Sequence, residues 1–309
     1  MICSIMDVRN LPVSNAESNP NILKFIITGA IPAFANALRR TIMSYVPTIA
    51  IDEVIMVENN TAMFDEYITH RLGLIPLNSD IDDLNLQSEC DVCDGAGCTS
   101  CTVTLTLTQE TDLSTSLIIK SSDLIPDDHR VYPIVDEIPI MKMGPDQRLI
   151  LEAVARFGNG REHAKWQPTA SIGFQYMPTI EIRPGSKFSK KVVEACPRDV
   201  LDYDEKNQSI NIKDLLACNL CMECVEVAEE NAIEVKGDST QIIFLLETNG
   251  ALPVENIVTK ASEILVEMTE NFIEGFQEAV ELAENEPNTM KRVVTFERIP
   301  MTGKEYETE

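Results

Sequence analysis

Four cysteines in the second half of the sequence have the spacing of ligands to an iron–sulfur cluster. Three of them form a C-x2-C-x2-C run, and the fourth lies upstream and is followed by a proline. A tight loop with this spacing can direct three thiolates at three irons of one cuboidal cluster, and a remote Cys-Pro supplies the last ligand. The predicted ligands of one 4Fe-4S cluster, or of a 3Fe-4S cluster after loss of one iron, are Cys196, Cys218, Cys221 and Cys224.

The segment around these cysteines, residues 183–236, resembles a bacterial-type ferredoxin domain that keeps one of its two cluster sites. In that family the run is C-x2-C-x2-C-x3-C-P, and its last cysteine binds the other cluster. Here three of the missing ligand positions are occupied by Ser186, Ser189 and Val192, and Ala228-Glu229 stands where the reciprocal Cys-Pro would be. A zinc site or reduced thiols are the alternatives for the remaining four cysteines, although zinc prefers two separate C-x2-C pairs.

A second group of cysteines has the spacing of a tetrahedral zinc site. It consists of two C-x2-C pairs, and Gly95 and Gly97 can turn the connection between them. Because that connection is short, a disulfide within the group remains an alternative. The predicted zinc ligands are Cys90, Cys93, Cys98 and Cys101. The ninth cysteine, Cys3, is expected to be a buried or incidental thiol.

Charge and missing motifs exclude several classes of function. The 309 residues include 50 acidic and 25 basic side chains, a net charge of −25, which argues against strong direct DNA binding and against docking on an anionic membrane. The sequence has no phosphate-binding glycine loop, no hydrolase motif and no metal-binding aspartate triad. His70 and His163 have no nucleophile nearby and are expected to be structural. With no apolar run long enough for a membrane span and no signal-peptide core, we expect a cytoplasmic protein.

Hydrophobic periodicity predicts the elements that position these groups. Alternating apolar residues predict strands at 22–29, 49–57, 103–107, 116–120, 170–182 and 240–246. Helices are predicted at 33–45, after Pro32, and at 64–74. Residues 210–212 and 232–235 are expected to pair as strands of the ferredoxin-like domain.

A long amphipathic helix is predicted after Pro253. Its apolar residues recur every three or four positions and comprise Ile257, Ala261, Ile264, Met268, Phe272, Phe276, Ala279 and Ala283. Core packing and dimerisation both bury such a stripe, so periodicity alone leaves the two interpretations open.

Three stretches resemble the RNA polymerase α family and its archaeal and eukaryotic relatives. PAFANALRRTIMSYVP (32–47) is similar to its N-terminal dimerisation helix, and HRLGLIPL (70–77) is similar to its second helix-and-turn signature. GREHAKWQP (160–168), which holds the only tryptophan, resembles a motif of the archaeal and eukaryotic α-like subunits. Together with GALPVENIV at the start of the long helix, the resemblance covers nearly the whole chain.

The resemblance implies an α+β fold built around an RNA polymerase α-type dimerisation domain. This discontinuous domain comprises residues 1–47 and 237–309. It carries two insertions, a β-rich domain at 48–182 with the cysteine knuckle and the ferredoxin-like domain at 183–236.

The resemblance also implies a non-catalytic assembly subunit, enzymatic only as part of DNA-dependent RNA polymerase. It would heterodimerise with the small α-like subunit L and form a platform for the large catalytic subunits and other small subunits. Zinc on the knuckle follows from eukaryotic relatives, and a cluster could stabilise its domain or regulate assembly. The implied contact residues are Arg39 and Arg40, for the large subunits, and Phe34, Leu38, Ile264, Met268, Phe272 and Phe276. The alternative is a ferredoxin-like electron-transfer or redox-sensing protein.

Overall fold

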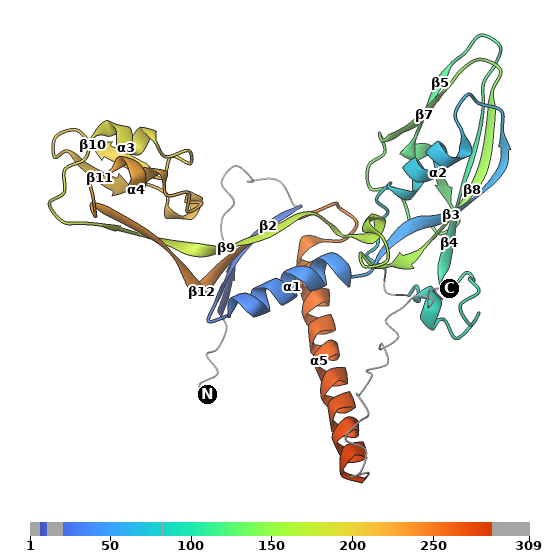
Figure 1. Ribbon diagram of the computed structural model, residues 1–309. Helices are drawn as coiled ribbons and strands as arrows, with labels where there is room; N and C mark the ends of the chain where they lie inside the picture. Colours follow the sequence, from blue (N-terminus) through green and yellow to red (C-terminus); the bar gives the residue numbers. More distant parts are fainter. Residues whose placement is uncertain (1–6, 11–20, 82, 286–309) are drawn as a thin grey trace, which may run out of the picture. The chain divides into compact units, whose positions relative to one another are not determined.

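A computed structural model describes residues 7–10, 21–81 and 83–285 of the chain (Figure 1). Cys3 therefore lies outside the described residues. Contacts between residues divide the chain into two units, which are described separately. The first combines Met1–Ala37 with Ile172–Leu246, and the second combines Leu38–Ser171 with Glu247–Glu309. The domain boundaries expected from the sequence stay predictions.

The first unit is built on a four-stranded sheet in the order β1-β2-β12-β9. Its strands are β1 (Asp7–Asn10), β2 (Ile22–Thr28), β12 (Ile233–Thr248) and β9 (Thr169–Ile182). Phe25 on β2 stacks on Phe244 of β12 with ring centroids 5.1 Å apart, and Phe174 of β9 lies 5.5 Å from the same ring. Side chains alternate between the faces of a strand, so these aromatic residues pack on one face of the sheet.

The segment predicted to resemble a ferredoxin domain, called the ferredoxin-like part below, is small and has its own apolar core. Its elements are α3 (Lys190–Glu194), β10 (Leu201–Asp204), β11 (Ser209–Ile212) and α4 (Glu223–Val227), with a 3₁₀ turn at Leu215–Ala217. The core residues are Phe188, Val192, Val200, Leu201, Ile210, Ala232, Ile233 and Val235.

The pairing predicted for residues 210–212 and 232–235 is wrong. Strand β11 pairs antiparallel with β10, with Leu201 opposite Ile212, because a tight turn at 205–208 joins these two strands. Ile233 instead begins β12, which runs on into the four-stranded sheet. A local hairpin closes a shorter loop than a pairing across the cysteine run, so it costs less chain entropy.

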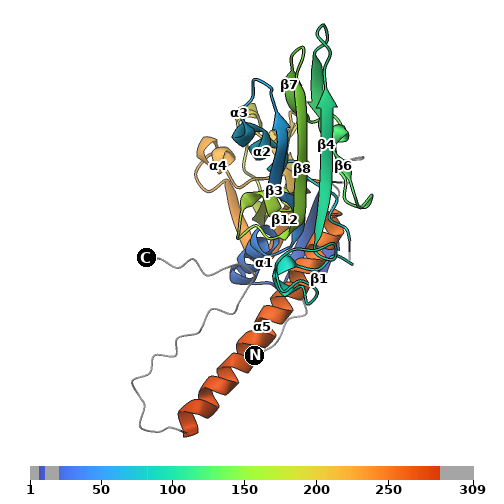
Figure 2. The same cartoon turned by 90° about the vertical axis from the view of Figure 1, so that its right-hand side faces the viewer.

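The second unit contains a long-stranded β-sheet covered by a helix (Figure 2). The sheet has the order β3-β8-β4-β6, and β5 and β7 form a separate ribbon. The strands are β3 (Thr48–Asn59), β4 (Thr102–Glu110), β5 (Leu117–Lys120), β6 (Ile125–Pro126), β7 (Pro139–Met143) and β8 (Arg148–Gly158). Helix α2 (Asp65–Gly73) buries Ile68 and Leu72 in the core that these strands share. Three 3₁₀ turns lie at Gln87–Glu89, Ser121–Asp123 and Ala164–Trp166.

Two further helices, α1 and α5, carry most of the predicted subunit-contact residues. Helix α1 (Pro32–Ser44) begins at a proline, as predicted, and joins the two units along the chain. Helix α5 (Val254–Asn285) confirms the predicted long helix. Its first turns are buried in their own unit at Val254, Ile257 and Ala261, whereas its last half extends beyond the other elements of that unit (Figures 1 and 2).

Most of the secondary structure predicted from periodicity is confirmed. The helices expected at 33–45 and 64–74 and the strands expected at 22–29, 49–57 and 170–182 are present with small shifts of their ends. Among the described residues, no helix has both the length and the apolarity needed to cross a membrane.

Phe244 and Leu245 provide a test of the aromatic core of the first unit. Phe244 is fully buried and Leu245 is 47% exposed on the opposite face of the same strand. Phe244→Ala should lower the free energy of unfolding by about 3–5 kcal/mol, because it leaves a cavity under two aromatic rings. Leu245→Ala is the matched control and should change it by less than about 1 kcal/mol. Chemical denaturation of the full chain measures both; equal losses would contradict this packing.

Candidate metal centres and contact surfaces

The first cysteine group gathers its four sulfur atoms around one point. Cys90 and Cys93 lie in the turn after the 3₁₀ segment at residues 87–89, and Cys101 immediately precedes β4. The Sγ–Sγ distances are 3.7 Å between Cys90 and Cys98, 3.6 Å between Cys93 and Cys101, and 3.8 Å between Cys98 and Cys101. All four sulfur atoms lie within 4.8 Å of one another, so this group could hold a metal ion.

These distances are those of a tetrathiolate tetrahedron. A zinc–sulfur bond of about 2.3 Å gives a tetrahedral edge of about 3.8 Å. A disulfide needs sulfur atoms only about 2.05 Å apart, and all four cysteines are free thiols here. The geometry therefore favours a metal ion over the disulfide left open by the spacing.

Backbone amides help to hold the thiolates of this group. The amide of Gly97 donates to Cys93 Sγ at 3.3 Å, and the amide of Cys98 donates to Cys101 Sγ at the same distance. Gly95 and Gly97 have φ angles of 81° and 95°, which confirms their predicted role in the turn. A hydrogen bond from the Ser100 backbone lowers the pKa of Cys98 to about 7, whereas burial raises that of Cys101 to about 12.

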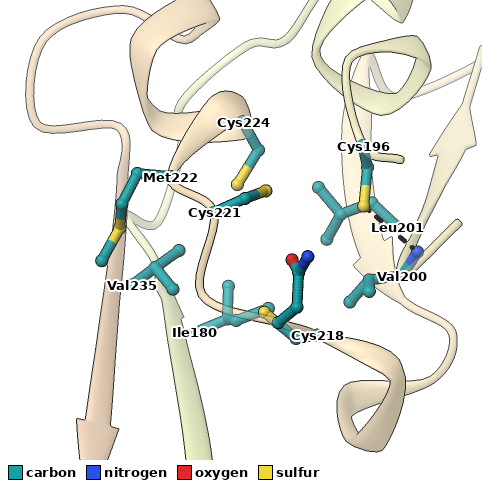
Figure 3. A pocket seen from close by; sticks show the side chains of 10 residues that line it. Ile180, Cys196, Val200, Leu201, Cys218, Cys221, Met222, Cys224 and Val235 are labelled. Atoms are coloured by element: carbon teal, nitrogen blue, oxygen red, sulfur yellow. Dashed lines mark hydrogen bonds between the residues drawn. The ribbon is translucent and has the colours of Figure 1, made fainter. Parts of the chain in front are cut away.

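The second cysteine group lines one apolar pocket in the ferredoxin-like part (Figure 3). All four predicted cluster ligands border this pocket, and its remaining lining is mostly apolar. The lining residues are Ile180, Cys196, Val200, Leu201, Cys218, Asn219, Cys221, Met222, Cys224 and Val235. The structure thus brings the upstream Cys-Pro and the C-x2-C-x2-C run together around one hollow.

The four thiols of this pocket are less tightly grouped than those of the first cysteine group. Among the described residues, the tight grouping that one ion requires occurs at residues 90–101 and not here. A cuboidal cluster binds each thiolate through a different iron, so its ligands stand farther apart. Burial raises the pKa of the Cys218 and Cys224 thiols, and a bound cluster would have to displace those protons. The amide of Val200 donates to Cys196 Sγ at 3.5 Å.

The loop between the cysteines adopts a backbone shape that binds anions. Leu220 and Met222 have φ angles of 59° and 66°, in the left-handed region that residues other than glycine rarely occupy. Each such residue costs on the order of 1–3 kcal/mol and persists only where its surroundings hold it there. Left-handed residues interleaved with ordinary ones turn successive amides inward, as in many iron–sulfur sites. No glycine marks these positions in the sequence, so they could not be predicted from it.

One of the positions where a two-cluster ferredoxin has its other ligands is occupied by a buried apolar side chain. Val192, at one of the lost ligand positions, is 1% exposed and packs with Phe188 in the core of the ferredoxin-like part. Ser189 precedes α3 as its N-cap residue. Apolar packing in this half takes the place of metal ligation.

The predicted contact residues of α1 differ in exposure. Arg40 is exposed, and Arg39 and Phe34 are half-buried. Leu38 is only 3% exposed and belongs to the core of the chain, and its role as a subunit contact stays a prediction. Ala35 and Ile42, one turn before and after it, are fully buried, because this face of α1 packs inward.

Helix α5 exposes more apolar surface than was predicted from the sequence. Phe272 and Phe276 are 58% and 54% exposed and stack with ring centroids 6.2 Å apart, whereas Ile264 and Met268 are half-buried. A second row of exposed side chains lies beside them, formed by Val266, Ile273 and Val280. Their seven-residue spacing is a helical repeat that could have revealed this row.

Comparison with known proteins identifies the family. The sequence matches the RNA polymerase Rpb3/Rpb11 dimerisation domain over residues 24–268. The chain belongs to this family.

Relatives in the Rpb3/Rpb11 family match across most of the chain. The DNA-directed RNA polymerase subunit Rpo3 of Archaeoglobus fulgidus is 39% identical over 243 residues, 79% of this chain and 89% of that protein. The Rpo3 subunit of Methanosphaera stadtmanae is 38% identical over 253 residues, covering 81% of this chain and 92% of that protein. The Rpo3 subunit of Thermococcus kodakarensis is 38% identical over 260 residues, which cover 83% of this chain and 94% of that protein.

Membership in the Rpb3/Rpb11 family confirms the resemblance drawn from three short motifs. The third motif, at 160–168, forms the turn that carries Trp166, and His163 Nδ1 there accepts a hydrogen bond from the Lys165 amide at 3.0 Å. His163 is therefore structural, as predicted. The relatives' names state neither a cofactor nor a metal, so the ligand assignments remain predictions.

Proposed function

We propose that this chain is the α-like assembly subunit of an archaeal DNA-directed RNA polymerase, of the Rpo3 type. It contributes to an enzyme only as a subunit and carries no catalytic residues of its own. The observation that carries the proposal is the apolar face of α5, which is buried at Ala261 but exposed at Val266, Phe272, Ile273, Phe276 and Val280. The match to a dimerisation domain over residues 24–268 supports the same interpretation.

The partner for this face is the small α-like subunit L. The exposed apolar side chains of α5 lie within a helix that is otherwise strongly acidic, so an apolar helix of the partner can cover them while the acidic faces stay in water. Large aromatic residues dominate the energy of such interfaces. Phe272 and Phe276 are therefore the expected anchors of the heterodimer.

Replacing the two anchors should abolish the heterodimer. Phe272→Glu with Phe276→Glu places two charges in a face that must be desolvated, and the affinity for subunit L should fall by more than about a hundredfold. The matched control is Glu270→Gln with Glu274→Gln, on the exposed polar side of α5, which should bind within about twofold of the parent chain. Isothermal titration or pull-down with the purified small subunit measures both. Parent-like binding of the double Glu variant would contradict the assignment.

Arg39 and Arg40 are proposed to contact the large catalytic subunits. They are adjacent cations in a chain of net charge −25, and both lie near the C-terminal end of α1. Guanidinium groups form strong bidentate bonds with carboxylates, so an acidic surface on a large subunit would recognise them.

Removal of this pair should separate two steps of assembly. Arg39→Ala with Arg40→Ala should leave the heterodimer with subunit L intact and weaken large-subunit capture by at least about tenfold. A pull-down of the large subunit by the preformed heterodimer measures the effect. Normal capture by the double variant would contradict the contact.

The ferredoxin-like part is proposed to hold one 4Fe-4S cluster on Cys196, Cys218, Cys221 and Cys224. Four thiols around one apolar pocket and left-handed backbone angles at Leu220 and Met222 support this ligand set. When bound, the cluster supplies four covalent links between two backbone segments that are distant in sequence. The apolar side chains of Ile180, Val200, Leu201 and Val235 would surround it. A stabilising role, with regulation of assembly through cluster loss, follows from this arrangement.

The knuckle at 90–101 is proposed to hold one zinc ion. The tetrahedral Sγ spacing and the two amide-to-sulfur hydrogen bonds support zinc on Cys90, Cys93, Cys98 and Cys101. This ion would tie the loop to Cys101, the residue that immediately precedes β4.

Two double variants should lose different metals, and each serves as the control for the other. Cys218→Ser with Cys221→Ser should lose the visible cluster absorbance and nearly all iron while keeping about one zinc per chain. Cys93→Ser with Cys98→Ser should keep about four irons and lose the zinc. Anaerobic purification with metal analysis measures both. Iron lost from both variants, or from neither, would contradict the two-site assignment.

A ferredoxin-like electron carrier is the weaker interpretation. The family match covers 24–268, most of the chain, and the position of a second cluster is occupied by Val192 and Phe188. An electron relay needs a neighbouring acceptor, which the apolar packing at this position does not provide.

A further inference from the structure

The tryptophan turn is held in place by unusually close packing. Trp166 is 2% exposed, and a Cβ atom added at Gly158 would fall well inside contact with its ring. The indole Nε1 donates to the Arg156 carbonyl at 3.2 Å, and the Trp166 carbonyl accepts from Thr48 Oγ1 at 2.7 Å. Only glycine at position 158 lets the ring approach the strand so closely.

Two cations and a carboxylate close over the same ring. The Arg156 guanidinium and the Lys165 ammonium lie 4.5 Å and 4.2 Å from the ring centroid. Asp52 joins them, accepting from Arg156 Nε at 2.7 Å and from Lys165 Nζ at 2.6 Å. Burial opposes ionisation of Asp52, but the hydrogen bonds from Lys165 and Arg156 hold its pKa below the usual value. The turn is thereby fixed by charge as well as by packing.

The same turn packs against the C-terminal end of helix α1. A Cβ atom at Gly160 would collide with the carbonyl oxygen of Met43, and the Arg161 amide donates to the Ser44 carbonyl at 3.0 Å. These carbonyls belong to the last turn of α1, which has no intrahelical partners for them. The turn at 158–166, called the Trp166 clamp here, therefore sets the position of that last helical turn.

Met43 links the clamp to a predicted subunit contact. Its sulfur accepts a hydrogen bond from Arg39 Nη1 at 3.2 Å, one helical turn earlier. Gly160 thus packs on the carbonyl of the residue whose side chain holds Arg39. A chain of contacts thus leads from the turn that carries Trp166, through Gly160 and Met43, to the guanidinium of Arg39.

We propose that the Trp166 clamp is a positioning device that presents Arg39 to an acidic surface of a large polymerase subunit, through Met43. The proposal rests on the proposed function of Arg39 and Arg40. Met43 and Gly160 are positioning residues, since neither needs to touch the partner. Fixing the guanidinium in advance removes the ordering cost that a free side chain meets on binding.

A double-mutant cycle on Met43 and Arg39 tests this proposal. In the preformed heterodimer with subunit L, Met43→Leu keeps the side-chain volume but removes the sulfur acceptor, and capture of the large subunit should weaken about fivefold. Met43→Gln restores an acceptor oxygen and should recover capture to within about twofold of the parent. In an Arg39→Ala background, Met43→Leu should have no further effect.

Gly160→Ala is the second variant and should weaken capture by a similar factor, with Gly173→Ala, which meets open space, as its control. Two results would overturn the proposal: unchanged capture by Met43→Leu, or independent, multiplying effects of Met43→Leu and Arg39→Ala. Unchanged capture by Arg39→Ala would also overturn it. The assembly function would still stand in that case if Phe272→Glu with Phe276→Glu abolished the heterodimer.

Discussion

Much of this structure depends on how the apolar face of α5 is covered. The helix has 32 residues, and its own unit buries the face only over the first turns, around Val254, Ile257 and Ala261. Further along, Phe272, Phe276 and their neighbours are more than one-third exposed. A contiguous apolar strip of this kind is unfavourable in water and indicates a binding surface. The remaining surface of α5 is acidic, so charged side chains border the apolar strip.

The two cysteine groups each bring four thiols together, but with different arrangements of the sulfur atoms. Both hold four thiols close together without a disulfide among them. At residues 90–101 two C-x2-C turns bring the sulfur atoms to the edge length of one tetrahedron. In the ferredoxin-like part the four thiols line an apolar pocket instead, and Leu220 and Met222 beside them have left-handed backbone angles. The two groups therefore differ in backbone geometry although each has four cysteines.

Local sequence patterns predicted many of the helices and strands, whereas features that depend on contacts between distant parts of the chain were not predicted. The spacing of the cysteines and the 3.6-residue period of α5 are local properties, so both could be predicted from the sequence. The partner of β11 depends on loop closure, which periodicity does not report. The burial of Leu38 depends on elements distant in sequence. The same holds for the close packing of Gly160 against the carbonyl oxygen of Met43. The exposed row at Val266, Ile273 and Val280 has a visible period and could have been found.

The central claim is that a partner subunit covers the exposed face of α5. Hydrogen–deuterium exchange of the full chain, alone and with the purified small α-like subunit, tests it most directly. We expect the amides at residues 266–280 to exchange at least about tenfold more slowly in the complex, while those of β10 and β11 keep their rates. Equal exchange rates at residues 266–280 with and without the partner would contradict the claim.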